Sequence, residues 1–184
     1  MRKWGLRIGL PLVLLAVLLG SWGWWHHQAK QVATVPVRTH TEKVKPVSAL
    51  TIAELKRQPK RLYAAVIYYA VKHVNIQRWQ EVSDFKQGWE VELDLVGGQT
   101  HYSVWPNQAI QESEKRLEPN WFTLKQGRVT YHSFVVHSDG DYQTHTVALT
   151  RIVRQVNADR AAKRIRHMPT RMRVLKVKNA TIAK

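Results

Sequence analysis

The chain has 184 residues, and its 29 Lys or Arg outnumber its 13 Asp or Glu, giving a formal net charge of +16 at pH 7. It contains no cysteine, which excludes disulfides, thiolate metal sites and a lipid-modified cysteine. The region from Ser48 to Lys184 is long enough for one domain with a core, and its stability must come from packing alone.

A membrane span is predicted at residues 8–25, which carry no charge. As a helix these residues would extend about 27 Å, close to the roughly 30 Å hydrocarbon core of a bilayer. The basic residues before the run predict a cytoplasmic N-terminus and place residues 28–184 outside. Tryptophans favour the membrane–water interfaces, and they lie at both ends of the run: Trp4 at one end and Trp22, Trp24 and Trp25 at the other.

A cleaved secretory signal is the alternative, and Ser21-Trp22-Gly23 offers one poor cleavage site. The tryptophans favour a retained anchor. The segment that follows is polar and basic and contains Pro36 and Pro46, so it is predicted to be a flexible stalk. The expected organisation is therefore an anchor at 1–25, a stalk at 26–47 and an extracytoplasmic domain at 48–184.

Three helices are predicted at the start of the domain. Thr51 and Glu54 have the spacing of a capping box, and Pro59 suits the first turn of a second helix. Residues 62–71 are apolar or tyrosine on every face, which predicts a buried core helix because ten residues cannot span a bilayer. Residues 75–82 predict a short third helix.

The pattern then changes to the two-residue period of strands. Residues 89–95 alternate apolar and acidic side chains, and Gly97-Gly98 predicts a hairpin turn into a strand that ends at Pro106. After a loop at 107–118, a meander of three strands is predicted, with turns at Gln126-Gly127 and Asp139-Gly140: 121–124, 129–137 and 142–149.

The C-terminal region is expected to be helical and basic. Thr150 is predicted to cap a helix, Asn157 to cap a second short helix, and residues 171–177 to form a final edge strand. The predicted fold class is thus α+β: an N-terminal transmembrane helix, then helices packed on an antiparallel sheet of about five strands, with a basic helical C-terminal region.

No motif specifies a reaction. Gly97-Gly98 lies between strands and lacks the helix that a phosphate-binding loop requires. With a two-residue turn at Asp139-Gly140, His145 would lie opposite Phe134 and share a sheet face with His132, but a zinc site needs a third protein ligand. The acidic residues that alternate along residues 90–94 predict a solvated strand face. The sequence therefore predicts no catalytic, cofactor-binding or metal-binding residue.

Charge is the strongest remaining signal. Residues 151–184 contain eleven Lys or Arg and one acid, Asp159. In a cytoplasmic protein this would indicate nucleic acid, whereas outside the membrane it indicates anionic envelope polymers or lipid headgroups. The alternative is a basic surface that only maintains solubility. The residues predicted to bind a polyanion are Arg160, Lys163, Arg164, Arg166, Arg171, Arg173, Lys176 and Lys178.

Four stretches resemble small extracytoplasmic proteins of Gram-positive lactic-acid bacteria: YYAVKHVNIQRW from Tyr68, NWFTL from Asn120, YHSFVVHS from Tyr131 and KRIRHMP from Lys163. The resemblance covers about residues 50–177. It implies a surface location, membrane-anchored or secreted, and carries over no activity and no catalytic residue. Some members resemble lipoproteins, and this chain departs from them because it has no cysteine.

Two classes of function remain open at this point. The first is a membrane-anchored, non-enzymatic envelope module that binds anionic polymers, lipid headgroups or a surface partner. The second is an anchored or secreted hydrolase with a site near His132 and His145. A third hypothesis, capture of nucleic acid at the surface, requires Trp105 or Trp121 beside the basic face for base stacking.

Overall fold

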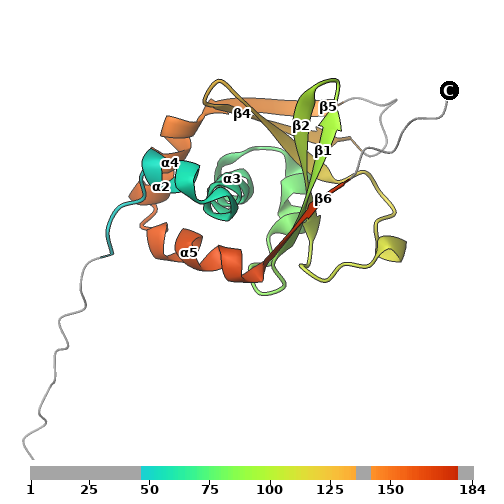
Figure 1. Ribbon diagram of the computed structural model, residues 1–184, viewed down its shortest axis with the longest axis horizontal. Helices are drawn as coiled ribbons and strands as arrows, with labels where there is room; N and C mark the ends of the chain where they lie inside the picture. The colour runs from blue at the N-terminus through green and yellow to red at the C-terminus, as the bar shows by residue number, and fades with distance from the viewer. Residues whose placement is uncertain (1–46, 136–141, 178–184) are drawn as a thin grey trace, which may run out of the picture. The chain divides into compact units, whose positions relative to one another are not determined.

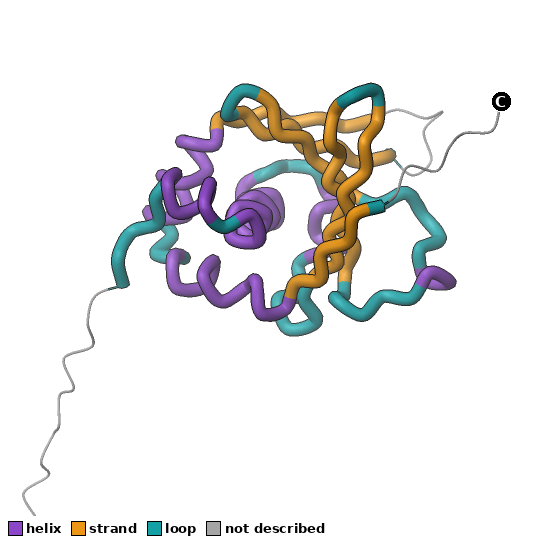
Figure 2. The backbone as a smooth tube through the Cα atoms, in the orientation of Figure 1, coloured by secondary structure: helices purple, strands orange, loops and turns teal. Residues whose placement is uncertain are grey.

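A computed structural model describes residues 47–135 and 142–177, which form an α+β domain of helices packed on a six-stranded mixed sheet (Figures 1 and 2). The predicted anchor and most of the stalk lie outside the described residues. In these two ranges, no helix combines the length and the apolar character needed to cross a bilayer. The elements are α2 (Ile52–Arg57), α3 (Pro59–His73), η1 (Gln77–Val82), β1 (Trp89–Val96), β2 (Gln99–Pro106), η2 (Glu112–Glu114), β3 (Asn120–Lys125), β4 (Arg128–Phe134), β5 (Tyr142–Ala148), α4 (Leu149–Ala158), α5 (Ala162–His167), η3 (Met168–Arg171) and β6 (Met172–Lys176).

Helix α3 is the centre of the domain, as predicted from its uniformly apolar sequence. Residues 63–71 are all buried. Figure 1 shows α3 end-on, with the sheet on one side and α2, α4 and α5 around the rest. Pro59 occupies the first turn of α3, where its missing N–H costs no hydrogen bond. A helix enclosed in this way can be apolar on every face.

One of the two hydrogen bonds of the capping box predicted for α2 is confirmed. The Thr51 hydroxyl accepts a hydrogen bond from the backbone N–H of Glu54 at 3.1 Å. The Glu54 carboxylate does not complete a capping box and instead accepts hydrogen bonds from Arg61 and Arg166. These contacts, which join residues farther apart in the sequence, tie α2 to the start of α3 and to α5.

The predicted third helix is a 3-10 helix, η1, and it buries Trp79 and Val82. The Trp79 ring packs edge-on against Tyr131 of β4 at 5.4 Å between ring centroids. The Tyr131 hydroxyl in turn donates to the backbone carbonyl of Val66 in α3 at 3.0 Å. These aromatic side chains therefore join the sheet to the central helix, and the tyrosine satisfies its buried hydroxyl.

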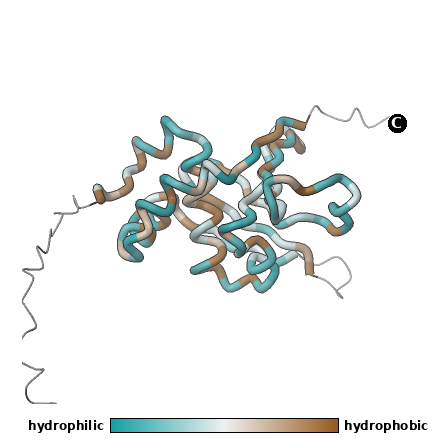
Figure 3. Tube along the Cα trace, turned by 90° about the horizontal axis from the view of Figure 1, so that it is seen from below, coloured by the Kyte–Doolittle hydropathy of each residue, from teal (hydrophilic) through white to brown (hydrophobic). Residues whose placement is uncertain are grey.

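The strands follow the order β5-β4-β3-β2-β1-β6, and every neighbouring pair except β1 and β6 is antiparallel. The predicted hairpin and the strands of the predicted meander are present. The buried apolar side chains of the strands form one core with those of α3, and the alternation of apolar and polar residues can be followed along the tube in Figure 3. The turn predicted at Asp139-Gly140 lies outside the described residues.

The predicted edge strand exists, but β6 runs parallel to β1, so the sheet has six strands and is mixed. The chain returns through α4 and α5 before it enters the sheet beside β1. This pairing requires Gly88, whose φ is +75° and whose added Cβ would lie 2.0 Å from the carbonyl oxygen of Arg171. Only glycine permits this close approach.

Two predicted caps in the C-terminal helices are wrong. Helix α4 begins at Leu149 with Ala148 as its N-cap, so Thr150 lies inside the helix, while the Leu149 N–H still bonds to the Gly127 carbonyl at the end of the sheet. Asn157 lies inside α4 and caps nothing. Its amide exchanges two hydrogen bonds with the backbone of Leu50, at 2.7 and 2.9 Å, and so fixes the start of the domain against α4. The predicted break between two short helices is present, at residues 159–161.

Candidate functional site

A basic hollow of about 650 Å³ lies where α4 gives way to α5. Its lining comes from α3 and from the α4–α5 region, segments about ninety residues apart in sequence. We define the basic hollow by its five cationic or imidazole side chains: Lys72, Arg160, Lys163, Arg164 and His167. Tyr68, Asp159 and Ala161 complete its wall. Three of the eight predicted polyanion-binding residues therefore converge in one concave surface.

Arg160 occupies a position that normally favours glycine. Its φ is +55°, in the left-handed region. The Ala161 N–H bonds to the carbonyl of Val156 and the Arg160 N–H bonds to that of Asn157, which is the Schellman arrangement at the end of a helix. A non-glycine residue in this conformation costs about 1 kcal/mol. The fold alone does not require an arginine there.

Asp159 is the one acid among the residues that line the basic hollow, and it is fully engaged. Its Oδ2 lies 2.6 Å from His73 Nε2 and accepts from the Tyr68 hydroxyl at 3.1 Å, while Oδ1 accepts from Gln155 at 2.9 Å. Partial burial raises the pKa of Asp159, but the bonds from His73, Gln155 and Tyr68 outweigh it and lower the pKa overall. The carboxylate is thus an internal anchor for the wall of the hollow.

The cations around Asp159 are open to solvent. Arg160, Lys163 and Arg164 are exposed, and within the described ranges Arg160 and Lys163 make no side-chain hydrogen bond or ion pair. Arg164 lies over the ring of Phe85 at 5.1 Å, a cation–π contact that holds the guanidinium in place without neutralising it. The hollow therefore presents concentrated positive charge with its hydrogen-bond donors unused.

The other predicted residues do not join this site. Arg166 donates to both carboxylate oxygens of Glu54 at 2.8 Å and to the backbone carbonyls of Ser48 and Ala49. Arg171 donates to the carbonyl of Lys86, and Arg173 pairs with Glu90 at 3.2 Å. Lys176 is exposed on β6, and Lys178 lies outside the described residues.

The sequence reasoning missed Lys72 and His167. Lys72 is exposed and directly follows the buried run of α3. A lysine at the point where an apolar helix ends is the sequence signal that could have indicated it. His167 ends α5, within the basic stretch, and was not selected because neutral histidine adds no formal charge. Only the packing of α3 against α5 brings these two side chains together.

The acidic residues predicted on a solvated strand face are instead partly buried, and this prediction is wrong for Glu90, which is fully buried. The carboxylates of Glu90, Glu92 and Glu112 lie close enough to share an ion. The ammonium of Lys115 already fills this position, at 2.8, 2.6 and 2.5 Å from them. Burial alone would lower the pKa of Lys115, but the three carboxylates raise it. We call this group the Lys115 cage, and it fixes the 107–119 segment on the side of the sheet away from α3.

The prediction that His132 and His145 share a face is wrong. His145 pairs with Tyr131 in the register of β4 and β5, whereas His132 pairs with Thr144, so the two imidazoles lie on opposite faces. The register differs by three residues from the one expected, and an odd shift reverses the face. They cannot act together on one ligand.

His132 instead belongs to a stack across β2, β3 and β4. The Trp121 indole lies between two imidazoles, with centroid distances of 4.1 Å to His101 and 3.6 Å to His132. Burial and the neighbouring His101 lower the pKa of His132 to about 4. Both faces of the Trp121 indole are covered by imidazoles, so Trp121 offers no free face to a nucleic-acid base. The ammonium of Lys115 lies over the Trp105 ring, 5.6 Å from its centroid.

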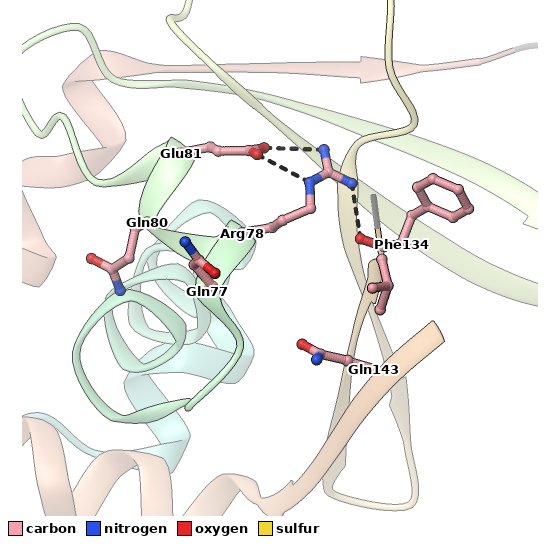
Figure 4. Close-up of a pocket in the computed structure, with 7 residues that line it drawn as sticks. Gln77, Arg78, Gln80, Glu81, Phe134 and Gln143 are labelled. Atoms are coloured by element: carbon pink, nitrogen blue, oxygen red, sulfur yellow. Dashed lines mark hydrogen bonds and ion pairs between the residues drawn. The ribbon is translucent and has the colours of Figure 1, made fainter. Parts of the chain in front are cut away.

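A second hollow, of about 460 Å³, lies between η1 and the ends of β4 and β5 (Figure 4). Its central side chain, Arg78, pairs with Glu81 at 3.0 and 3.1 Å and donates to the carbonyls of Phe134 and Glu118. These bonds use all three guanidinium nitrogens and hold three segments together. The arginine acts as a brace here, and its charge is already balanced.

No family model, curated protein or solved structure matches the chain.

Proposed function

We propose that the protein is a non-enzymatic binding module of the cell envelope, anchored through residues 8–25, whose extracytoplasmic domain binds anionic polymers in the basic hollow. The observation that carries this proposal is Arg160, an arginine kept at a helix terminus where glycine would be less strained. Its side chain lines the hollow beside Lys163 and Arg164. Backbone strain of this kind is concentrated at ligand-binding and catalytic sites.

The chemistry of the hollow favours phosphate-rich or otherwise strongly anionic chains. Guanidinium groups bind phosphate and carboxylate with two parallel hydrogen bonds, and lysine adds a mobile point charge. Asp159 does not oppose such a ligand strongly, because its charge is balanced by hydrogen bonds from His73, Tyr68 and Gln155. A polymer is the preferred ligand because the hollow is open and is lined by the exposed face of α5, which carries Lys163, Arg164 and His167.

The test compares two triple variants of the full-length chain in detergent, each with three fewer positive charges. The first replaces the cations of the hollow by glutamine: Arg160→Gln, Lys163→Gln and Arg164→Gln. The control replaces exposed cations elsewhere: Lys56→Gln, Lys125→Gln and Arg128→Gln. Long-chain inorganic polyphosphate is the probe, and binding is measured by fluorescence anisotropy over a range of salt concentrations.

At about 1 kcal/mol for each basic residue, the hollow variant should bind about 100-fold more weakly and lose about three units of salt slope. The control variant should lose much less. Equal losses in the two variants would show that only net charge matters, and would overturn the proposal.

Vesicles containing phosphatidylglycerol, with phosphatidylcholine vesicles as the reference, form a second arm of this test. If the hollow variant loses vesicle binding but keeps polyphosphate binding, the hollow recognises lipid headgroups and the polymer proposal fails.

A further inference from the structure

The two edges of the sheet differ in how they are protected from pairing with another strand. Edge strands in monomeric proteins usually carry charges, proline or a bulge that prevents such pairing. Strand β6 follows this rule, since Arg173 and Lys176 are exposed in a strand of only five residues. Strand β5, with the sequence YQTHTVA, contains no Lys, Arg, Asp, Glu, Pro or Gly, and its first five residues are exposed.

The hydrogen-bond phase of β5 shows which backbone groups point away from the sheet. The Leu149 N–H donates to the Gly127 carbonyl at 2.9 Å, in the same register as the β4–β5 ladder. Antiparallel ladders bond at every second residue, so positions 143, 145 and 147 bond to β4. Positions 142, 144, 146 and 148 therefore direct their N–H and C=O groups outward, and within the described residues no strand lies beyond them.

The sequence of β5 is complementary to itself about a two-fold axis at His145. In that arrangement Thr144 lies opposite Thr146 of the second copy, and Tyr142 lies opposite Ala148. All the outward backbone groups of both strands are then paired. The threonine pairs would extend a row that already crosses the sheet, where Thr123, Thr130 and Thr146 are in register and the last two hydroxyls lie 2.9 Å apart.

Charge also limits where on the surface a second copy can pair. Two chains of net charge +16 repel each other, so close pairing requires a contact strip without charge. Strand β5 provides such a strip, because the self-pairing places no Lys, Arg, Asp or Glu opposite a like residue. We propose that β5 is a homodimer interface, through which two copies pair antiparallel about His145 and join their sheets.

The test uses the absence of cysteine in the chain. In the proposed dimer His145 faces its own copy as a non-hydrogen-bonded pair, where Cα atoms lie about 4.5 Å apart, within the range that a disulfide can bridge. The full-length His145→Cys variant in detergent should form a disulfide dimer on mild oxidation, resolved by non-reducing electrophoresis. Lys176→Cys, exposed on the other edge, is the matched control and should remain monomeric.

A second variant separates pairing through β5 from any association through the predicted membrane anchor, because it changes β5 alone. Adding Thr144→Lys and Thr146→Lys to His145→Cys places lysine opposite lysine on an exposed face, which should reduce the dimer yield by about tenfold or more without unfolding the domain. Failure of His145→Cys to dimerise, equal yields from both cysteine positions, or a yield unchanged by the lysines would each overturn the proposal. Circular dichroism checks that each variant is folded.

Discussion

Arg160, Lys163 and Arg164 surround an open hollow, whereas three further arginines, a few residues along the same chain, are bound to the domain itself. Both groups come from one basic stretch that is uniform in composition. The two groups differ in their surroundings. The arginines of the second group donate to carboxylates or carbonyls of segments distant in sequence: Arg166, Arg171 and Arg173. The first group meets none, so its charge remains available to a ligand.

The largest effect on stability is expected where the backbone of Arg171 packs against Gly88. Gly88→Ala would place a methyl group 2.0 Å from the Arg171 carbonyl oxygen, at a φ of +75°. We expect a loss of at least about 3 kcal/mol in the free energy of unfolding, measured by urea denaturation.

Gly127→Ala is the control for Gly88→Ala. Gly127 has a similar φ of +73° but no atom within 4 Å of its added Cβ, so this change should cost only about 1 kcal/mol. Equal losses at the two positions would contradict the close approach of the Arg171 backbone to Gly88.

Removing Arg166, the most heavily bonded arginine of the second group, should have the next largest effect. Arg166→Met deletes the paired hydrogen bonds to Glu54 and those to two backbone carbonyls, and should cost about 2 kcal/mol by the same measurement. Lys163→Met, in the hollow, should change the free energy of unfolding by no more than about 0.5 kcal/mol. Similar costs for both variants would remove the distinction between the two groups.

The ion pair of Arg166 with Glu54 should also make the stability of the domain depend on pH. Hydrogen bonds from Arg166 lower the pKa of Glu54 in the folded chain below its ordinary value of 4.5. The contribution of Glu54 to stability is therefore present above pH 4.5 and is lost as the pH falls through the lower, folded value. Arg166→Met should weaken this acid dependence, whereas Lys163→Met should leave it unchanged.

The histidine stack should produce a smaller effect at higher pH. Because the pKa of His132 falls from 6.5 to about 4 on folding, the folded domain resists its protonation. Stability from this residue is present above pH 6.5 and declines as the pH falls towards 4. Solvent screening at a half-exposed ring keeps the decline on the order of 1 kcal/mol. His132→Gln should flatten this part of a pH–stability profile, and an unchanged slope would contradict the stacked arrangement.

The sequence predicted most of the elements because they depend on local patterns. The apolar run at residues 62–71 could only be a buried helix, and the alternation at residues 89–95 could only be a half-buried strand. The face of His145 was not predictable, because it depends on the register across a connection whose length the turn residues did not reveal. The burial of Glu90 was equally hidden, since its partner Lys115 comes from a distant loop.

The candidate site was predictable in part for the same reason. Charge density pointed to residues 160–178, and three of the selected residues line the hollow. Charge density could not separate them from Arg166, because that residue is neutralised by Glu54, more than a hundred residues earlier. Nor could it indicate the backbone strain at Arg160, which depends on where α4 ends.

Arg160→Gly tests most directly whether the cations of the hollow serve a ligand and not the fold. Glycine relieves the left-handed conformation and should raise the free energy of unfolding by up to about 1 kcal/mol, although its more flexible unfolded chain offsets part of this gain. Polyphosphate binding by the same full-length variant should weaken by several-fold. Stability that rises while binding falls is the predicted result. A variant that is less stable, or that binds as tightly as the original chain, would contradict the account.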